Sequence, residues 1–280
     1  MTPLLGCDTH VHVFGSLEAY PMPPDRHYTP PPASTQDLLA HLQGQGLSRV
    51  VLVQPSVYGF DNACLLDGLD VLKGQARGVV VINEATTQAQ LQAMHARGVR
   101  GVRINQESVA ASDVTRLEHA LRIHAAQVAH LGWHIQVYAQ TAVIAACAPL
   151  IRQLGLPVVL DHFALWCDPS SISPDAQTVL GLLQDGVVYI KLSGSYRVPL
   201  QTPEDLCTVA HRLVATRADR ILWASDWPHT NRTPGLKPTQ ISPYRHIAPS
   251  NLRSERDAWL VNLAVQQQVL VDNPARLYGF

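Results

Sequence analysis

Eight short apolar runs recur along this chain, and most of them are separated by segments with helical patterning. The runs lack the strict alternation of apolar and polar residues that is typical of a sheet with one solvent-exposed face. Each run is therefore expected to be a strand of a parallel sheet that is buried on both faces. The predicted strands cover residues 4–14, 49–54, 77–83, 99–105, 133–138, 157–162, 186–193 and 220–226. Eight such units within 280 residues predict an α/β fold, a single-domain (β/α)8 TIM-type barrel over residues 1–280.

An open, doubly wound sheet is the alternative architecture. It is disfavoured because no Gly-rich phosphate-binding fingerprint follows the first strand. Glycines are expected to end several of the helices, because glycine readily adopts a positive φ. Gly46 would end a helix over 35–45, Gly74 one over 61–72 and Gly155 one over 141–154, and a last helix is predicted over 252–269.

The net charge and the cysteine content limit which partners and which cell compartment the sequence favours. The net charge is −1, with three lysines and no basic stripe, which argues against nucleic acid and anionic membranes as partners. No apolar run reaches the ~18 residues of a membrane helix. The five cysteines are scattered without a CxxC pair, which favours a reducing cytoplasm over a disulfide framework. A small-molecule ligand is the remaining expectation, and the sequence does not fix the oligomeric state.

Polar side chains stand where the predicted strands end, which is where barrels of this kind gather their functional residues. The first run presents His10 and His12, which project to the same side of a strand because they are two residues apart. Later runs end in Arg103, His162 and Asp226. The sequence therefore predicts that these five side chains converge at one rim.

Three histidines and an aspartate permit two chemistries. They could hold a divalent metal that acidifies a water molecule. Alternatively, Asp226 could act as a base while the histidines donate hydrogen bonds to a developing oxyanion. Asp226 could also be structural, as a helix cap or an arginine partner. Asp161 alternates with His162 and is expected either to support the site from behind or to point away from it.

Seven motifs occur in order along the chain: Asp8-Thr9-His10-Val11-His12, Tyr28-Thr29-Pro30, Gly98-Val99-Arg100-Gly101-Val102-Arg103, Leu131-Gly132-Trp133-His134, Asp161-His162, Ser225-Asp226-Trp227-Pro228-His229 and the ending over 272–280. Together they resemble the amidohydrolase superfamily, and within it the 2-pyrone-4,6-dicarboxylate lactonase branch. The resemblance extends over essentially the whole chain.

That resemblance implies a barrel that hydrolyses lactones of small, acidic metabolites, in the pyrone lactonase itself without a bound metal. Asp226 would activate the hydrolytic water, and His10, His12 and His162 would polarise the lactone carbonyl. The expected substrate-binding residues are Arg103 and Arg197, which would hold carboxylates, with Tyr28, Ser56 and Tyr138 lining the pocket and His229 close to Asp226.

The same residues bear on the metal question. Metal-binding members of the superfamily use a carboxylated lysine or a glutamate on strand four and a histidine at the end of strand five. Here these places hold Arg103 and Tyr138, while His134 at the entry of strand five is expected to be structural. We therefore expect no required metal. The alternative is a hydrolase or decarboxylase with one zinc or manganese ion at His10, His12, His162 and Asp226.

Two departures from the lactonase pattern bear on the substrate. The lactonase has another substrate-binding arginine after strand four, where residues 106–111 of this chain contain none. The Gly-Arg-Pro-like turn after His162 is replaced by Ala164-Leu165-Trp166-Cys167. Both changes predict a less cationic or more apolar pocket, suited to a lactone with one carboxylate, or to a sulfonated or sugar-acid lactone. The alternative outside the enzymes is a protein that binds an acidic metabolite without converting it.

Overall fold

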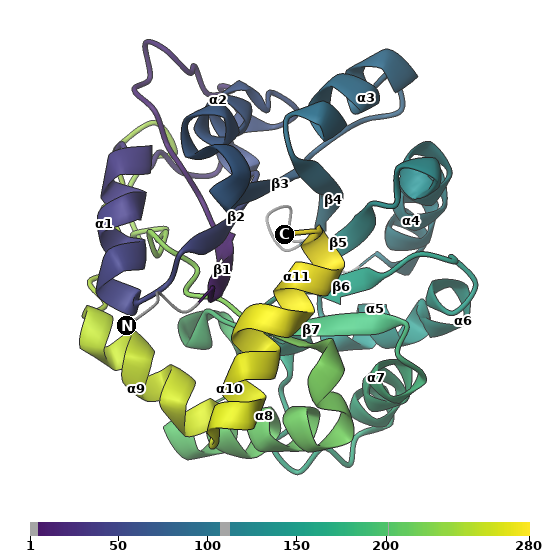
Figure 1. The fold of residues 1–280 in the computed structure, drawn as a ribbon. Coiled ribbons are helices and arrows are strands. Elements are labelled where there is room, and N and C mark those ends of the chain that lie inside the picture. The colour runs from purple at the N-terminus through teal and green to yellow at the C-terminus, as the bar shows by residue number, and fades with distance from the viewer. Residues whose placement is uncertain (1–4, 107–112, 201) are drawn as a thin grey trace.

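A closed barrel of eight parallel strands forms the centre of the computed structural model, which describes residues 5–106, 113–200 and 202–280 (Figure 1). Each strand pairs with the next one along the chain. The strands are β1 (Cys7–Val11), β2 (Arg49–Val53), β3 (Ala76–Val80), β4 (Val99–Asn105), β5 (His134–Tyr138), β6 (Val158–Leu160), β7 (Val188–Leu192) and β8 (Ile221–Trp223). The predicted (β/α)8 barrel is confirmed.

The barrel closes between β1 and the residues just after β8. Val11 forms a parallel bridge with Trp227. The backbone N–H of His12 donates to the Trp227 carbonyl at 2.8 Å, and that of Asp226 donates to the His10 carbonyl at 3.1 Å. These bonds join the first and last predicted site segments directly, so closing the barrel also builds the site.

Helices surround the barrel (Figure 1). They are α1 (Thr35–Gln45), α2 (Ala63–Leu72), α3 (Gln88–Ala96), α4 (Val114–Val128), α5 (Thr141–Ala146), α6 (Ala148–Ile151), α7 (Pro174–Asp185), α8 (Pro203–Arg217), α9 (Pro249–Trp259), α10 (Leu263–Gln267) and α11 (Asn273–Tyr278). Helix α1 matches its prediction, because Ser34 forms a capping box at its start and Gly46 ends it at φ +69°.

Three helix ends differ from the predictions. Lys73, not Gly74, takes the positive φ (+49°) after α2. The predicted helix over 141–154 is divided into α5 and α6, because Pro149 has no N–H to donate to the preceding turn. The predicted helix over 252–269 is also divided, since α9 ends at Trp259 and Asn262 begins α10 by accepting a hydrogen bond from Val265 N–H at 2.9 Å.

The barrel interior has an apolar core that the end of the chain covers. Its buried members are Cys7, Val51, Val53, Val79, Val159, Tyr189, Leu222 and Tyr278. Phe280 packs against this cluster where the strands begin, with the guanidinium groups of Arg49 and Arg77 over its ring at 5.2 and 4.6 Å. The end where the strands finish is thereby left for the polar site.

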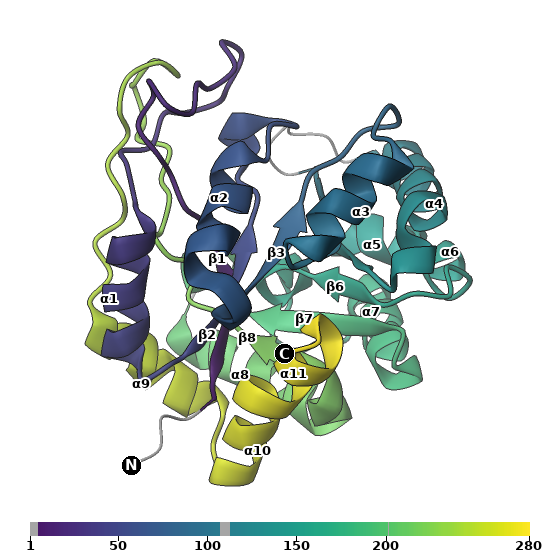
Figure 2. The same ribbon diagram turned by 45° about the horizontal axis from the view of Figure 1, so that its top comes forward.

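Two long irregular segments rise side by side at that other end (Figure 2). One follows β1 and is rich in proline, as predicted, and the other follows β8. Thr29 and Ile241 form a parallel bridge, and the backbone N–H of Ser242 donates to the Thr29 carbonyl at 2.8 Å. These contacts tie the two segments together at the end of the barrel where the strands finish.

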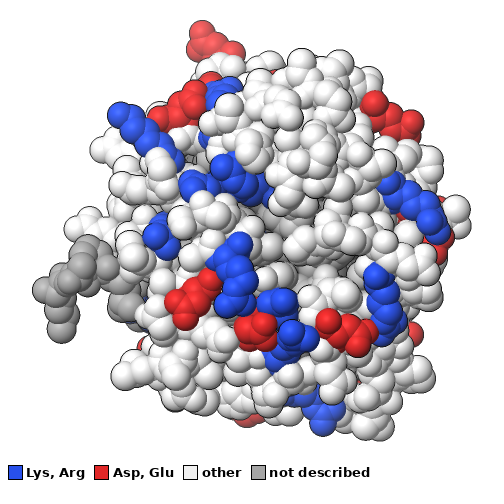
Figure 3. All heavy atoms as spheres, turned by 45° about the vertical axis from the view of Figure 1, so that its right-hand side comes forward, with Lys and Arg blue, Asp and Glu red and all other residues white. Residues whose placement is uncertain are grey.

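The outer surface carries mixed charge. On the face that Figure 3 shows, basic and acidic side chains are interspersed. Within the described ranges, no helix is both long and apolar enough to cross a bilayer.

Candidate active site

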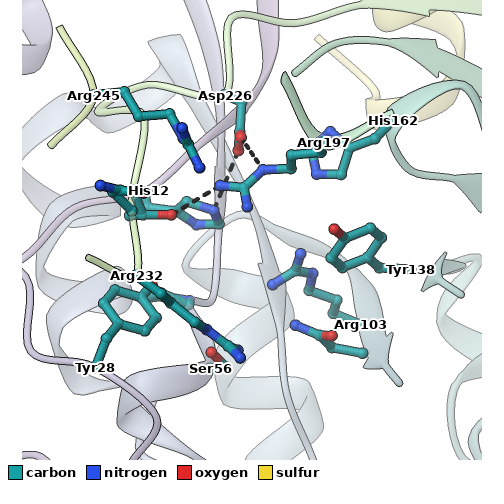
Figure 4. Close-up of a pocket in the computed structure, with 14 residues that line it drawn as sticks. His12, Tyr28, Ser56, Arg103, Tyr138, His162, Arg197, Asp226, Arg232 and Arg245 are labelled. Carbon is teal, nitrogen blue, oxygen red and sulfur yellow. Dashed lines mark hydrogen bonds and ion pairs between the residues drawn. The ribbon is translucent and has the colours of Figure 1, made fainter. Parts of the chain in front are cut away.

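A cavity of about 260 Å³ opens where the strands end (Figure 4). That volume corresponds to roughly nine water molecules, enough for one substituted ring. Its lining residues are His12, Tyr28, Pro55, Ser56, Arg103, Asn105, Tyr138, His162, Arg197, Asp226, Thr230, Asn231, Arg232 and Arg245. All but two of the predicted site residues therefore line the cavity. The two exceptions are His10, which lies beneath it, and His229.

His10 of β1, His12 just after β1 and Asp226 after β8 lie close together around one carboxylate oxygen. Asp226 Oδ1 lies 3.7 Å from His10 Nε2 and 3.6 Å from His12 Nε2. The His10 and His12 rings are 4.9 Å apart, and the His10 and His162 rings 5.0 Å apart. All four side chains are buried. The predicted convergence of distant segments is confirmed.

The two oxygens of Asp226 have different surroundings. Oδ2 accepts hydrogen bonds from the Tyr196 hydroxyl at 2.7 Å and from Arg197 Nε. Oδ1 has no hydrogen-bond donor among the described residues, although it is buried. Burial alone would raise the pKa of this carboxyl, but the Arg197 guanidinium and the neighbouring histidines together outweigh burial and hold the pKa well below its usual range. Asp226 is therefore ionised, with one oxygen available as a proton acceptor.

Hydrogen bonds at Nδ1 set the tautomers of His10 and His12. His12 Nδ1 lies 2.7 Å from the Val53 carbonyl oxygen, which can only accept, so Nδ1 carries the proton. His10 Nδ1 lies 3.2 Å from the Asp161 carboxylate, which favours the same tautomer. Burial lowers the pKa of both rings, which are thus neutral at pH 7. Each ring then presents an Nε2 lone pair toward Asp226.

His162 can adopt the opposite tautomer. Its Nδ1 lies 2.9 Å from Ser193 Oγ, and a serine hydroxyl is able either to donate to that nitrogen or to accept from it. When the hydroxyl donates, the ring proton is on Nε2. His162 follows β6 in a turn where it has φ +50°, and its ring meets that of Tyr138 edge to face at 4.9 Å. Burial lowers its pKa to about 4. A neutral His162 can therefore donate a hydrogen bond into the cavity.

A buried polar layer supports the site from beneath. Asp161 accepts hydrogen bonds from Gln136 Nε2 at 3.0 Å and from His10, and it lies 3.5 Å from both Arg103 Nη2 and Lys191 Nζ. Burial would raise the Asp161 pKa, but His10, Lys191 and Arg103 outweigh burial and hold it well below its usual range. Burial lowers the Lys191 pKa to about 8. Asp161 is expected from the sequence either to support the site from behind or to point away from it, and it supports the site.

Four arginines line the cavity: Arg103, Arg197, Arg232 and Arg245. Asp226 is the one carboxylate on its wall within the described part of the chain. The prediction of a less cationic pocket is relative to the pyrone lactonase and stays a prediction. The segment after β8 supplies Arg232 and Arg245, which its irregular sequence did not indicate. The arginine-free stretch after β4 lies, over residues 107–111, outside the described residues.

His229 does not line the cavity, although its backbone N–H donates to the Asp226 carbonyl at 2.9 Å. Its buried ring lies between the rings of Tyr196 and His41, at 6.3 and 6.4 Å, because the turn after Asp226 directs it away from the opening. His134 is buried at the far end of β5 against Tyr278, as expected of a structural residue.

Sequence reasoning missed several residues of this site. Tyr196 directly precedes the predicted Arg197. Lys191 is the one charged residue inside the run over 186–193, a signal that could have marked a buried ion pair. Arg232 and Arg245 gave no comparable signal.

The family model for amidohydrolases matches residues 7–280. The chain belongs to the amidohydrolase family. Among curated amidohydrolase relatives, it is 31% identical to the 4-sulfomuconolactone hydrolase of Rhizobium radiobacter, over 97% of this chain and 89% of that protein. It is also 31% identical to the 2-pyrone-4,6-dicarboxylate hydrolase of Comamonas testosteroni, over 99% and 90% of the two chains.

A crystal structure with the same amidohydrolase fold extends the comparison. It is a probable 2-pyrone-4,6-dicarboxylic acid hydrolase from Acinetobacter baumannii with citric acid bound. The identity is 26%, the TM-score is 0.79, and the match covers 99% of this chain and 100% of that one.

Proposed function

We propose that this amidohydrolase opens the lactone ring of a small carboxylated metabolite, of the 2-pyrone-4,6-dicarboxylate type or a related lactone, with Asp226 as the general base. The observation that carries the proposal is the position of Asp226, whose Oδ1 has no hydrogen-bond donor among the described residues and faces two imidazoles in an arginine-lined cavity. Hydrolases of a sulfomuconolactone and a pyrone dicarboxylate among the relatives support the same class, and the citric acid in the solved relative supports an acidic ligand.

The tautomers support a division of labour among the histidines. A water molecule between Asp226 and His12 can donate one proton to Oδ1 and the other to Nε2, which leaves a lone pair for attack. His162 donates from Nε2 to the lactone carbonyl oxygen and stabilises the charge that develops there. Arg103, beside Tyr138, is placed to hold a substrate carboxylate.

The reaction then needs no other group. Asp226 takes a proton from water as the water oxygen bonds to the carbonyl carbon. The ring C–O bond breaks when the tetrahedral intermediate collapses, and Asp226 returns its proton to the leaving oxygen. The product is the open-chain acid, and Asp226 is again a carboxylate.

The metal-dependent alternative has an observation in its favour. Donor atoms of His10, His162 and Asp226 lie within 4.8 Å of one another, and His10 Nε2 and Asp226 Oδ1 are both buried without a hydrogen bond among the described residues. Such a donor set fits one zinc or manganese ion, with His12 adjacent. A divalent ion there would lower the pKa of a bound water. We favour the metal-free reading because Arg197 already neutralises Asp226 and Arg103 adds positive charge nearby.

An assay of several lactones, with and without prior removal of bound metal, tests the proposal. Purified protein would be assayed on pyrone, muconolactone and aldonolactone types, as isolated and after dialysis against a chelator, with metal content measured on the same samples. We expect turnover of an acidic lactone that the chelator leaves unchanged. Activity that disappears with a stoichiometric metal and returns on adding it back would favour the alternative, and binding without turnover across the panel would exclude both enzymes.

The pH profile tests the protonation states directly. Asp226 has a pKa held well below its usual range, and His162 stays neutral down to about pH 4. We therefore expect kcat/KM to stay level as the pH falls and to decline only near or below about pH 4. An unperturbed base and an unperturbed histidine would make kcat/KM decline at a higher pH. A decline of kcat/KM centred near the ordinary histidine pKa of about 6.5 would contradict this assignment.

A further inference from the structure

Side chains of β1 take part in closing the barrel against the end of β8. The backbone–backbone bonds of this closure lie at the residues that follow Ser225. Just before them, Thr9 Oγ1 donates to the Trp223 carbonyl at 2.8 Å, and the backbone N–H of Ser225 donates to Asp8 Oδ1 at 3.0 Å. Both contacts are buried and join residues more than 200 positions apart. Two side chains therefore extend the hydrogen bonding along the line where the first and last strands meet.

One oxygen of Asp8 serves both sides of this junction. Besides the Ser225 N–H, Oδ1 accepts the backbone N–H of His10 at 3.3 Å, a local contact of the kind that an aspartate makes two residues along the chain. The pairing of β1 with β2 shifts register between Asp8 and Val11, so β1 departs from a regular strand at this point. The same buried carboxylate thus holds the backbone of one proposed site residue and of the residue just before another, Asp226.

The other oxygen of Asp8 faces the outer helix layer. Oδ2 lies 3.5 Å from Nε2 of His41, a residue of α1, and neither atom has a hydrogen bond among the described residues. The His41 ring also lies 5.8 Å from that of Trp227, the residue after Asp226. Asp8 is therefore enclosed between β1, the end of β8 and α1. Loss of its carboxylate would leave two buried N–H groups without an acceptor.

We propose that Asp8 is a positioning residue for the hydrolysis, because its carboxylate fixes the segment that carries Asp226 against the strand that carries His10. This inference rests on the proposed function. Asp8 is not among the described residues that line the cavity, so it acts through the residues that it holds. Asp226 Oδ1 and the imidazole nitrogens come from separate strands, and their 3.6–3.7 Å spacing depends on how the two backbones are joined. Misplacing reacting groups by about 1 Å can cost about 100-fold in rate.

Three variants separate positioning from stability. Asp8→Ala removes the acceptor of both N–H groups, whereas Asp8→Asn keeps an oxygen for them and places an NH2 group that can donate to His41 Nε2. Asn273→Ala is the matched control, because it also removes two hydrogen bonds of a buried side chain to the backbone. Asn273 Nδ2 donates to the carbonyls of Ala218 at 2.8 Å and Ile221 at 2.7 Å, at the start of β8 and thus at the other end of the strand from the site.

Steady-state kinetics on the hydrolysed lactone, well below the Tm of every variant, measure the catalytic effect. Asp8→Ala should lower kcat about 10- to 100-fold and leave KM within about threefold, because the cavity wall is intact while the base is displaced. Asp8→Asn should keep kcat within about threefold of the wild type, and Asn273→Ala should lower Tm with kcat unchanged. An unchanged kcat in Asp8→Ala, an equal loss in Asp8→Asn, or a loss matched by Asn273→Ala would overturn the positioning role.

Amide hydrogen exchange, measured by mass spectrometry, reports on the same junction without any lactone. Asp8→Ala should speed exchange about tenfold or more in peptides that contain residues 8–12 and 223–228, since the N–H groups of His10 and Ser225 lose their acceptor. Asn273→Ala should leave exchange over 8–12 unchanged. Unchanged exchange in Asp8→Ala would overturn the inference even if kcat fell. A wild type that hydrolyses none of the lactones would instead contradict the proposed function, and exchange would still decide whether Asp8 holds the two strands in place.

Discussion

We expect Asp226→Asn to lower kcat about 1000-fold on the lactone that the wild type hydrolyses, because removal of a positioned general base costs roughly 100- to 10,000-fold. The amide cannot take the proton of the attacking water. Ligand binding should persist, since asparagine has nearly the same shape and retains an acceptor oxygen. Steady-state kinetics, with calorimetric binding of benzene-1,3-dicarboxylate to the same variant, would measure both quantities.

The backbone conformation tolerates this substitution. Asp226 has φ +60°, a region that asparagine and aspartate adopt more readily than other non-glycine residues. Tyr196→Phe is the control, because it deletes one hydrogen bond to Oδ2 and keeps the carboxylate, so kcat should fall about tenfold at most. A near-normal kcat in Asp226→Asn would show that another group activates the water.

Asp161→Asn should lower stability by about 3–5 kcal/mol at pH 7, the usual cost of leaving a buried charge without its partner. Lys191 Nζ and Arg103 Nη2 both lie 3.5 Å from this carboxylate, and all three side chains are buried. For a chain of this size the loss corresponds to a Tm lower by about 10 °C, which calorimetry would detect.

The pH dependence of that difference follows from the direction of the pKa shift. The Asp161 pKa is lower in the folded protein than in the unfolded chain, so its stabilisation is present above the unfolded pKa of about 3.9 and is lost as the pH falls toward the folded value. The gap in Tm between wild type and Asp161→Asn should therefore narrow below about pH 4. The double variant Asp161→Asn/Lys191→Met removes the orphaned ammonium and should recover part of the loss. A Tm unchanged in Asp161→Asn would mean that the buried layer is not held by charge.

Local rules account for the elements that the sequence predicted well. The apolar runs located all eight strands, because a strand buried on both faces needs continuous apolar residues. Ser34 and Gly46 located α1, because both its caps depend on adjacent residues alone. Two helix ends departed from the predictions: Pro149, itself a local signal, interrupts a helix that the apolar pattern continues, and Lys73 takes the positive φ although Gly74 stands next to it.

For the site, the sequence by itself determined which residues could do chemistry at the strand ends: His10, His12, Arg103, His162 and Asp226. Their spacing after apolar runs was enough, because a barrel brings all its strand ends to one rim. The tertiary structure alone decided the rest. Partners far away in the chain contact the ring nitrogens: the Val53 carbonyl sets which nitrogen of His12 carries the proton, and the Ser193 hydroxyl lies within hydrogen-bond distance of His162 Nδ1. The paired loops after β1 and β8 bring Arg232 and Arg245 to the opening, and no local pattern in an irregular segment encodes that approach.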